Sequence, residues 1–252
     1  MCIGHGLSRR RFLAGAGALS LAGGCDGGFP IDLVSDDRIE AMGLEAWQQM
    51  HTGTRRSDDA DLQRALDTVA GRLLTAAGER TDAWEAVVFE GPEINAFALP
   101  GNKIGVFEGL FGVVGNLDQL AAVVGHEIGH LQAEHGHERV NTQVAKDLGL
   151  RVIAFLLQQG DVQFAAEIAA ALGLGVEFGL VLPYSRNQEL EADRLGLQIM
   201  ASGGYDPAQA VDLWRRMEAA GGPRAPAFLA THPAPAQRIE AIEAMLPEIR
   251  AG

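Results

Sequence analysis

Two histidines four residues apart, His126 and His130, can offer two imidazole nitrogens to a single metal ion. They lie in an apolar run at 117–131 that predicts a helix, and residues four apart on a helix share one face. Glu127 points about 100° round the helix from His126, which places its carboxylate beside the ion rather than on it. A carboxylate there can act as general base for a metal-bound water, so the pattern indicates a zinc hydrolase. The same five-residue pattern occurs in proteins without zinc, which leaves a structural role open.

A catalytic zinc needs three protein ligands and one open position, so a third ligand must come from elsewhere in the chain. Glu189 and Asp193 are also four apart on a predicted helix and share its face. One carboxylate can bind the metal, while the other accepts a hydrogen bond from a ligand histidine and fixes its tautomer. Glu191 lies about 200° round from Glu189 and should face away. Alone, such an acidic pair is more typical of a solvated helix face.

Cysteine takes no part in the predicted site, because Cys2 and Cys25 both precede the folded body. Zinc, one ion per chain, must therefore be held by histidine and carboxylate. On a continuous helix His135 would turn to the far side from His130, and His137 would lie about 10 Å along the axis. We expect neither to be a ligand.

The elements that must position these side chains are mainly helical. Residues 36–50 and 58–77 repeat apolar residues at helical spacing. Three segments rich in β-branched and aromatic residues follow, at 84–89, 94–99 and 103–107. The last two flank a Pro-Gly pair that favours a type II turn and hence a β-hairpin. We therefore expect an α+β fold, mainly helical, with a small three-stranded antiparallel sheet.

The helix that carries His126 has a clear start signal, because Asn116 can cap it with Gln119 as capping-box partner. Later helices are predicted from Pro183 to about residue 202, from Asp206-Pro207 to about 219, and over 235–249.

Two further segments, 148–157 and 162–182, are strongly apolar. Charged residues interrupt both, which favours buried or lid helices over membrane spans, although an interfacial role stays open.

The first residues form an export signal. S-R-R-R-F-L at 8–13 resembles the bacterial twin-arginine signal, and the apolar stretch 14–22 is too short to span a bilayer. Cys25 ends a segment that resembles a lipobox, and its lipidation would attach the protein to a membrane. Ala22 stands where that pattern prefers leucine, so a plain soluble signal with a chance cysteine is the alternative.

Asp26, after the cysteine, resembles an inner-membrane retention signal. We expect an exported, periplasmic bacterial protein with its signal at 1–24, a tether at 25–35 and one folded domain, which carries the predicted zinc site, at 36–252.

The chain is acidic, with a formal net charge of −13. This argues against nucleic acid or anionic lipid as a charge-driven partner, and the simplest role of the charge is solubility.

Several motifs in order resemble one family. H-E-I-G-H at 126–130 and S-R-x-x-E-x-E-A-D-R-x-G at 185–196 are similar to the gluzincin metallopeptidases of the HtpX, Oma and CAAX-protease group. The likeness is strongest to periplasmic BepA-like and LoiP-like members. The segments N-A-F-A-L-P-G at 95–101, G-G-Y-D-P at 203–207 and T-H-P at 231–233 resemble further landmarks of that family. Together they cover roughly residues 36–248.

The sequence departs from the family pattern in two respects. Asn102 and Lys103 replace more usual small residues at the hairpin turn, which leaves substrate preference open. The tandem helical repeats of BepA have no counterpart in this sequence.

The resemblance implies a zincin-like fold and a zinc endopeptidase. The implied zinc ligands are His126, His130 and Glu189; Glu127 would be the base and Asp193 would support a ligand. His232 would lie near the metal, where it could stabilise the tetrahedral oxyanion or occupy the open zinc position at rest. A structural histidine before Pro233 is equally compatible. Arg238 would assist there or only pair with a carboxylate.

Two functions from different classes follow. The first is an endopeptidase for unfolded or misassembled envelope proteins, whose strand at 94–99 pairs with an extended substrate. The second is an envelope chaperone or docking protein with a latent zinc site, in which the apolar region 148–182 covers the cleft or binds a partner. A small-molecule metallohydrolase such as an esterase is a third possibility.

Overall fold

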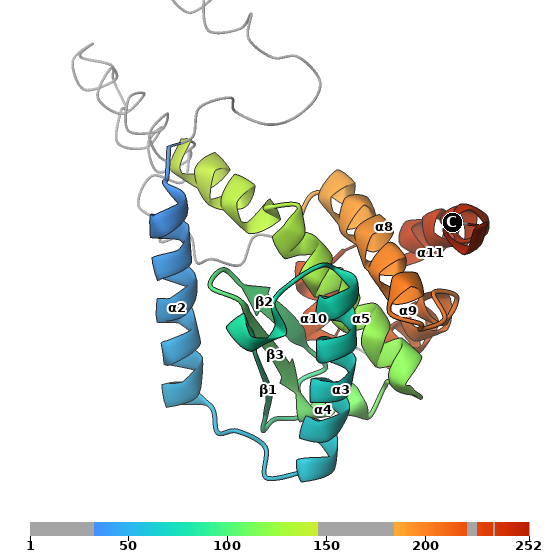
Figure 1. The fold of residues 1–252 in the computed structure, drawn as a ribbon, viewed down its shortest axis with the longest axis horizontal. Helices are drawn as coiled ribbons and strands as arrows, with labels where there is room; N and C mark the ends of the chain where they lie inside the picture. Colours follow the sequence, from blue (N-terminus) through green and yellow to red (C-terminus); the bar gives the residue numbers. More distant parts are fainter. Residues whose placement is uncertain (1–32, 146–183, 221–225, 234, 252) are drawn as a thin grey trace, which may run out of the picture. The chain divides into compact units, whose positions relative to one another are not determined.

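Helix α5 (Leu117–Gln132) is buried from Gln119 to His130, and the neighbouring elements pack against it (Figure 1). The computed structural model describes residues 33–145, 184–220, 226–233 and 235–251. Residues 120–125 of α5, just before the metal motif, are apolar on every side of the helix, which suits a helix enclosed by other elements. Its neighbours are α3 (Ala60–Ala76), α8 (Arg186–Ser202), α9 (Gln209–Ala220) and strand β2 (Ala96–Leu99).

The start of α5 follows the predicted cap with one change. Asn116 Oδ1 accepts a hydrogen bond from the Gln119 N–H at 2.9 Å. The Gln119 side chain accepts from the Gly115 N–H at 2.7 Å rather than from Asn116, so the reciprocal half of the capping box is shifted by one residue.

The three predicted strands are present, but the sheet is mixed rather than antiparallel. Strands β1 (Glu85–Phe89), β2 and β3 (Lys103–Phe107) lie in the order β1-β3-β2. β2 and β3 form the predicted antiparallel hairpin, and Gly101 in its turn has a φ of 86°, as a type II turn requires. β1 runs parallel to β3. After β1 the chain leaves the sheet and forms β2 at the opposite edge. β3 then reverses direction and fills the middle position, where it runs parallel to β1.

The two outer edges of the sheet have different neighbours. The outer edge of β1 is covered by residues 55–57, which bond to it through Ser57 N to Val88 O and Glu90 N to Arg55 O. The outer edge of β2 faces α5, where Ala98 N–H donates to a side chain of that helix. The sheet therefore offers one edge to the metal-motif helix.

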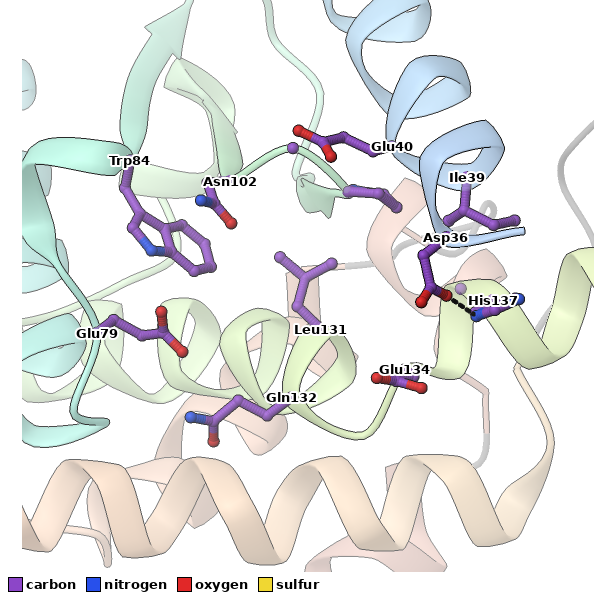
Figure 2. Close-up of a pocket in the computed structure, with 13 residues that line it drawn as sticks. Asp36, Ile39, Glu40, Glu79, Trp84, Asn102, Leu131, Gln132, Glu134 and His137 are labelled. Carbon is purple, nitrogen blue, oxygen red and sulfur yellow. Dashed lines mark ion pairs between the residues drawn. The ribbon is translucent and has the colours of Figure 1, made fainter. Parts of the chain in front are cut away.

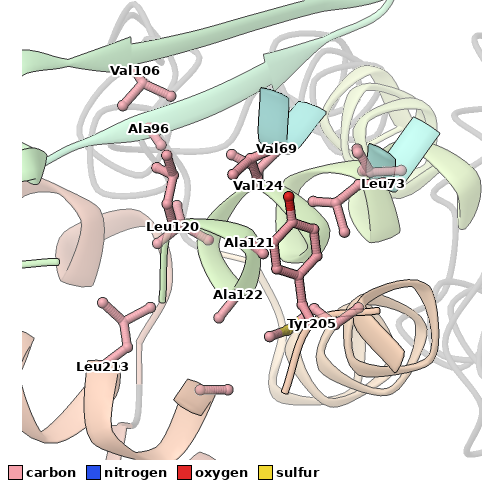
Figure 3. Close-up of a cluster of buried hydrophobic side chains, with 14 of the residues drawn as sticks. Val69, Leu73, Ala96, Val106, Leu120, Ala121, Ala122, Val124, Tyr205 and Leu213 are labelled. Carbon is pink, nitrogen blue, oxygen red and sulfur yellow. The ribbon is translucent and has the colours of Figure 1, made fainter. Parts of the chain in front are cut away.

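The main hydrophobic core joins α3, the sheet, α5 and the later helices (Figure 3). Val69 and Leu73 of α3, Val106 of β3 and Leu120 of α5 are almost completely buried in it. Side chains from segments far apart in the sequence thereby hold α5 in place on several sides.

Helices α2 (Asp36–Gly53) and α11 (Pro235–Ala251) lie close to their predicted ranges. Three short elements were not predicted from the sequence: a 3-10 turn η2 (Thr81–Ala83), α4 (Glu108–Phe111) and α10 (Ala227–Thr231).

Two helix starts differ from the sequence expectation. Helix α8 begins at Arg186 rather than at Pro183, because Ser185 and Gln188 form a capping box. α9 begins at Gln209, with Asp206 Oδ1 accepting from Ala208 N–H just before it.

The expected export signal, most of the tether and the apolar segments at 148–182 lie outside the described residues. Among the helices that are described, none combines the length and the apolar character needed to cross a bilayer.

Candidate metal centre

Helices α5 and α8 approach closely because small residues line their contact. A Cβ added to Gly129 would lie 2.7 Å from the Ala192 carbonyl oxygen. A Cβ added to Gly196 would lie 2.9 Å from the backbone nitrogen of His126. Neither position has room for a larger residue unless the backbones move apart. The short helix separation lets the imidazoles of α5 and the carboxylates of α8 meet.

Four buried side chains bring one donor atom each to a common point. The Nε2 atoms of His126 and His130 are 3.0 Å apart. Glu189 Oε1 lies 3.3 Å from His130 Nε2 and 3.0 Å from His232 Nδ1. His232, which follows α10, places the same Nδ1 3.2 Å from His126 Nε2. We call these four side chains the donor cluster.

The donor cluster fits one zinc ion. Zinc prefers four tetrahedral ligands at about 2.0–2.1 Å, which places neighbouring donors about 3.3 Å apart. The four distances given above, 3.0–3.3 Å, are close to that spacing. Histidine and carboxylate are also donors that zinc accepts. Beside the cluster, Glu127 Oε1 is buried without a hydrogen-bond partner among the described residues, as expected where a water belongs.

Burial favours the neutral form of the two histidines of α5, which is the form that binds a metal. It lowers the pKa of His130 to about 4. Burial and the nearby Arg238 charge hold the pKa of His126 well below its ordinary value. Burial alone would raise the pKa of Glu189, but hydrogen bonds from His130 and His232 and the nearby positive charges lower it below its ordinary value.

Asp193 and Arg238 form a buried ion pair behind the ligands. Arg238 Nε and Nη2 donate to the Asp193 carboxylate at 2.7 and 2.5 Å, and Nη1 lies 2.5 Å from Glu189 Oε2. The guanidinium carbon lies 3.8 Å from the centroid of the Trp214 ring. Asp193 Oδ1 is 3.1 Å from His126 Nδ1. Arg238 Nη2 also lies 3.1 Å from His126 Nδ1. When His126 Nε2 binds a metal, Nδ1 must carry the ring proton, and it could then donate to Asp193, which would fix the tautomer.

Glu127 lies beside the donor cluster and connects it to the sheet. Its Oε2 accepts a hydrogen bond from the Ala98 N–H at 3.0 Å, and its Oε1 lies 3.3 Å from His232 Nε2. Burial raises the pKa of Glu127 to about 7, because the charged carboxylate loses its hydration. A carboxylate with a pKa near neutrality can both accept and return a proton.

The ring of His232 is held between two aromatic side chains. It stacks on Phe228 and Tyr184, with ring centroids 4.4 and 5.3 Å apart. Tyr184 also stacks on His130 at 4.0 Å. This packing directs Nδ1 of His232 toward the donor cluster and Nε2 toward Glu127, so both ring nitrogens face groups of the site.

A further histidine reaches the site against the sequence expectation. Helix α5 ends at Gln132, Glu134 adopts a φ of 54°, and helical residues resume at 135. This break turns His135 back, so that its Nδ1 lies 2.9 Å from His130 Nδ1. The expectation that His135 faces the far side is wrong because the helix is not continuous.

Glu191 is the outer partner of His135. Its side chain is 61% exposed, as expected for a residue facing away from Glu189. Its Oε2 nevertheless lies 3.3 Å from His135 Nε2.

A separate cavity of about 410 Å³ lies among α2, the hairpin turn and the end of α5 (Figure 2). Trp84, Asn102 and Leu131 line it, and Figure 2 shows Asp36 paired with His137 at its rim, 3.3 Å apart. No side chain of the donor cluster lines this cavity. His137 thus belongs to another part of the surface.

Residues 56–246 match the model of Peptidase family M48. The chain belongs to this family. The gluzincin resemblance inferred from the motifs is therefore confirmed, and the matched region contains the whole donor cluster, Glu127, Asp193 and Arg238.

The relatives of this M48 chain include mitochondrial and bacterial proteins. It is similar to the mitochondrial metalloendopeptidase OMA1 of Schizosaccharomyces pombe, with 39% identity over 73% of this chain and 52% of the relative. It is also similar to the OMA1 metalloendopeptidase of Bos taurus, with 35% identity over 83% and 42%. The β-barrel assembly-enhancing protease of Escherichia coli K12 is 28% identical over 79% and 42%. The chain spans about half or less of the length of these relatives.

In this M48 chain the structure brings together all the site residues singled out from the sequence. They are His126, Glu127, His130, Glu189, Asp193, His232 and Arg238. The sequence reasoning missed the contact of His135 with His130 and the stacking of Tyr184. No sequence signal marks the break before His135, since Ala133 and Glu134 are residue types common in helices.

Proposed function

We propose that this M48 chain is a zinc-dependent endopeptidase that cleaves extended segments of unfolded or misassembled envelope proteins. The observation that carries the proposal is the position of Glu127, which lies between the donor cluster and the outer edge of β2. His126, His130 and Glu189 would hold the zinc. When bound, zinc lowers the pKa of a water to about 7 and polarises the scissile carbonyl.

The edge of β2 supports an extended peptide substrate. Phe107 N–H bonds to Asn95 O, so the alternation of an antiparallel ladder also pairs Phe97 with Gly105 through hydrogen bonds. Ala96 and Ala98 therefore direct their N–H and C=O groups away from β3. A substrate strand can pair with these groups other than Ala98 N–H, which already donates to the proposed base. Such pairing would bring a peptide carbonyl of the substrate to the metal site. Because it uses backbone groups, it would depend little on the side chains of the substrate.

Each side chain of this site has a separate role in the proposed reaction. Glu127 takes a proton from the attacking water and passes it to the leaving amine. Asp193 holds the tautomer that directs His126 Nε2 to the metal. His232 occupies the fourth position at rest, with its Nδ1 in the donor cluster and its Nε2–H directed at Glu127. Substrate must then displace His232, which makes room for the water beside Glu127 Oε1.

Substitution of the base tests the enzymatic proposal. Glu127→Gln should retain zinc, measured by metal analysis of the purified full chain, and lose casein hydrolysis by at least about 10²-fold. Glu218→Gln changes an exposed carboxylate on α9 in the same way and should hydrolyse casein like the wild type. Full casein hydrolysis by Glu127→Gln would contradict the role of the base.

The substrate can be identified with the same variant. Glu127→Gln expressed in the native host should retain bound polypeptides that mass spectrometry identifies, and envelope proteins should be enriched over a His126→Ala control. Equal protection of envelope assembly by the wild type and Glu127→Gln in a complementation assay would instead favour a chaperone with a latent zinc site.

The proposed location rests on the residues before the folded domain. We propose export through the twin-arginine signal at 8–13 and lipid attachment at Cys25, with Asp26 favouring the inner membrane. Labelling with a radioactive fatty acid should mark the wild type and not Cys25→Ser. Equal labelling of the two proteins would rule out Cys25 as the attachment site.

A further inference from the structure

We infer that His135 and Glu191 form a hydrogen-bonded relay that fixes the ring orientation and tautomer of the zinc ligand His130. This inference rests on the proposed zinc ligation and assigns positioning roles to two residues outside the donor cluster. The relay runs from Glu191 Oε2 to His135 Nε2 at 3.3 Å, and from His135 Nδ1 to His130 Nδ1 at 2.9 Å.

The chemistry of the atoms allows one arrangement of protons along this relay. His130 Nε2 faces the donor cluster and must be free of a proton to bind zinc, so His130 carries its proton on Nδ1. That Nδ1–H can only donate, and His135 Nδ1 must accept. His135 therefore carries its own proton on Nε2 and donates it to the carboxylate of Glu191. Every donor meets an acceptor, and every ring is neutral.

The backbone is shaped to make this contact. Glu134 adopts a φ of 54°, a left-handed conformation that residues other than glycine seldom take. A regular helix through this position would carry His135 away from His130. His135 is instead only 2% exposed and packs its ring edge-on against His130, with centroids 5.0 Å apart. The conformation of Glu134 is thus the local feature that brings His135 to the ligand.

The relay completes a pattern that His126 already has. His126 Nδ1 lies against Asp193, a buried carboxylate. Without His135, Nδ1 of the buried His130 would have no partner among the residues that the structure describes, although ligand histidines in metal sites usually have one. Because Glu191 is largely exposed, its contribution should be smaller than that of His135.

Zinc affinity measures this role independently of catalysis. The full chain is stripped with a chelator, and its zinc affinity is determined by competition with a fluorescent chelator. His135→Leu should bind zinc about 10–100-fold more weakly than the wild type. His135→Gln supplies an oxygen that can accept from His130 Nδ1–H and should recover part of that loss. His51→Leu replaces a half-buried histidine of α2 and should leave zinc affinity unchanged.

Glu191→Gln tests the outer half of the relay without disturbing a buried position. It should weaken zinc binding a few-fold in the wild-type background and have no further effect in His135→Leu, because both residues act through one contact. Urea unfolding of the metal-free variants identifies any loss of folding, and Glu191→Gln should unfold like the wild type.

The outcomes separate this inference from the proposed zinc ligation. Wild-type affinity in His135→Leu, with zinc binding abolished in His130→Ala, would overturn the relay and leave the ligation intact. An effect of Glu191→Gln that persists undiminished in His135→Leu would also overturn it. Undiminished zinc binding by His130→Ala would refute the ligation itself and the relay with it.

Discussion

Glu127→Gln should make the metal-free protein more stable at neutral and alkaline pH while it abolishes catalysis. Burial raises the pKa of Glu127 from 4.5 to about 7. The folded protein therefore holds this proton more tightly than the unfolded chain does, and the wild type loses stability as the pH rises from 4.5 to 7. Glutamine cannot ionise, so the variant avoids this loss.

The expected gain follows from the size of the pKa shift. A shift from 4.5 to about 7 corresponds to about 3 kcal/mol at pH 8, where the carboxylate is charged in both states. At pH 5 the gain should fall below about 1 kcal/mol, because the folded wild type is still protonated. His130 has the opposite slope. Its pKa falls from 6.5 to about 4, so the stability that its neutral form contributes is lost as the pH falls through that window.

In the wild type, the effects of Glu127 and His130 on the pH dependence of stability oppose each other. In Glu127→Gln the effect of Glu127 is absent, so the effect of His130 can be measured. Urea unfolding of the chelator-treated full chain between pH 5 and pH 8 measures both. We expect the stability of Glu127→Gln to rise with pH more steeply than that of the wild type, because the lowered pKa values of His126 and His130 act in both proteins and the opposing effect of Glu127 acts only in the wild type. Glu218→Gln, an exposed control, should follow the wild type. If Glu127→Gln is less stable than the wild type at pH 8, burial of its charge is not the dominant effect.

Three further predictions concern the support of the metal centre. Arg238→Met leaves the buried Glu189 and Asp193 without their cation and should destabilise the metal-free protein by about 3–5 kcal/mol in urea unfolding; a loss below about 1 kcal/mol would contradict this account of the ion pairs. Gly196→Ala should push α5 from α8, cost about 1–3 kcal/mol and weaken zinc binding in the chelator competition, whereas wild-type zinc affinity would show that the helix separation is not limiting. Because burial already keeps His130 neutral, zinc affinity should change little between pH 7 and pH 5 and fall steeply only near pH 4; a decline that begins at pH 6.5 would refute this.

Much of the site was predictable from local periodicity. His126 and His130 share a face of α5, and Glu189 and Asp193 share a face of α8, because four residues make about one helical turn. The hairpin followed in the same way from the turn residues between β2 and β3. These predictions succeeded because each involves only residues within one element or on either side of one turn.

The parallel pairing of β1 with β3 could not be predicted in this way. Strand composition indicates that a segment is extended, but it does not determine which strand occupies the middle of a sheet. The expected antiparallel sheet was wrong for this reason.

The sequence by itself determined that two imidazoles share a face of one helix and two carboxylates share a face of another, because residues four apart are about one helical turn apart. Only the tertiary structure decided how they are supported. Arg238 joins Glu189 and Asp193 because α11 packs beside α8, and His135 reaches His130 because the backbone breaks at Glu134. Contacts between elements depend on how the elements pack and on the backbone angles of single residues. Neither produces a repeating pattern of residue types that could be recognised in the sequence.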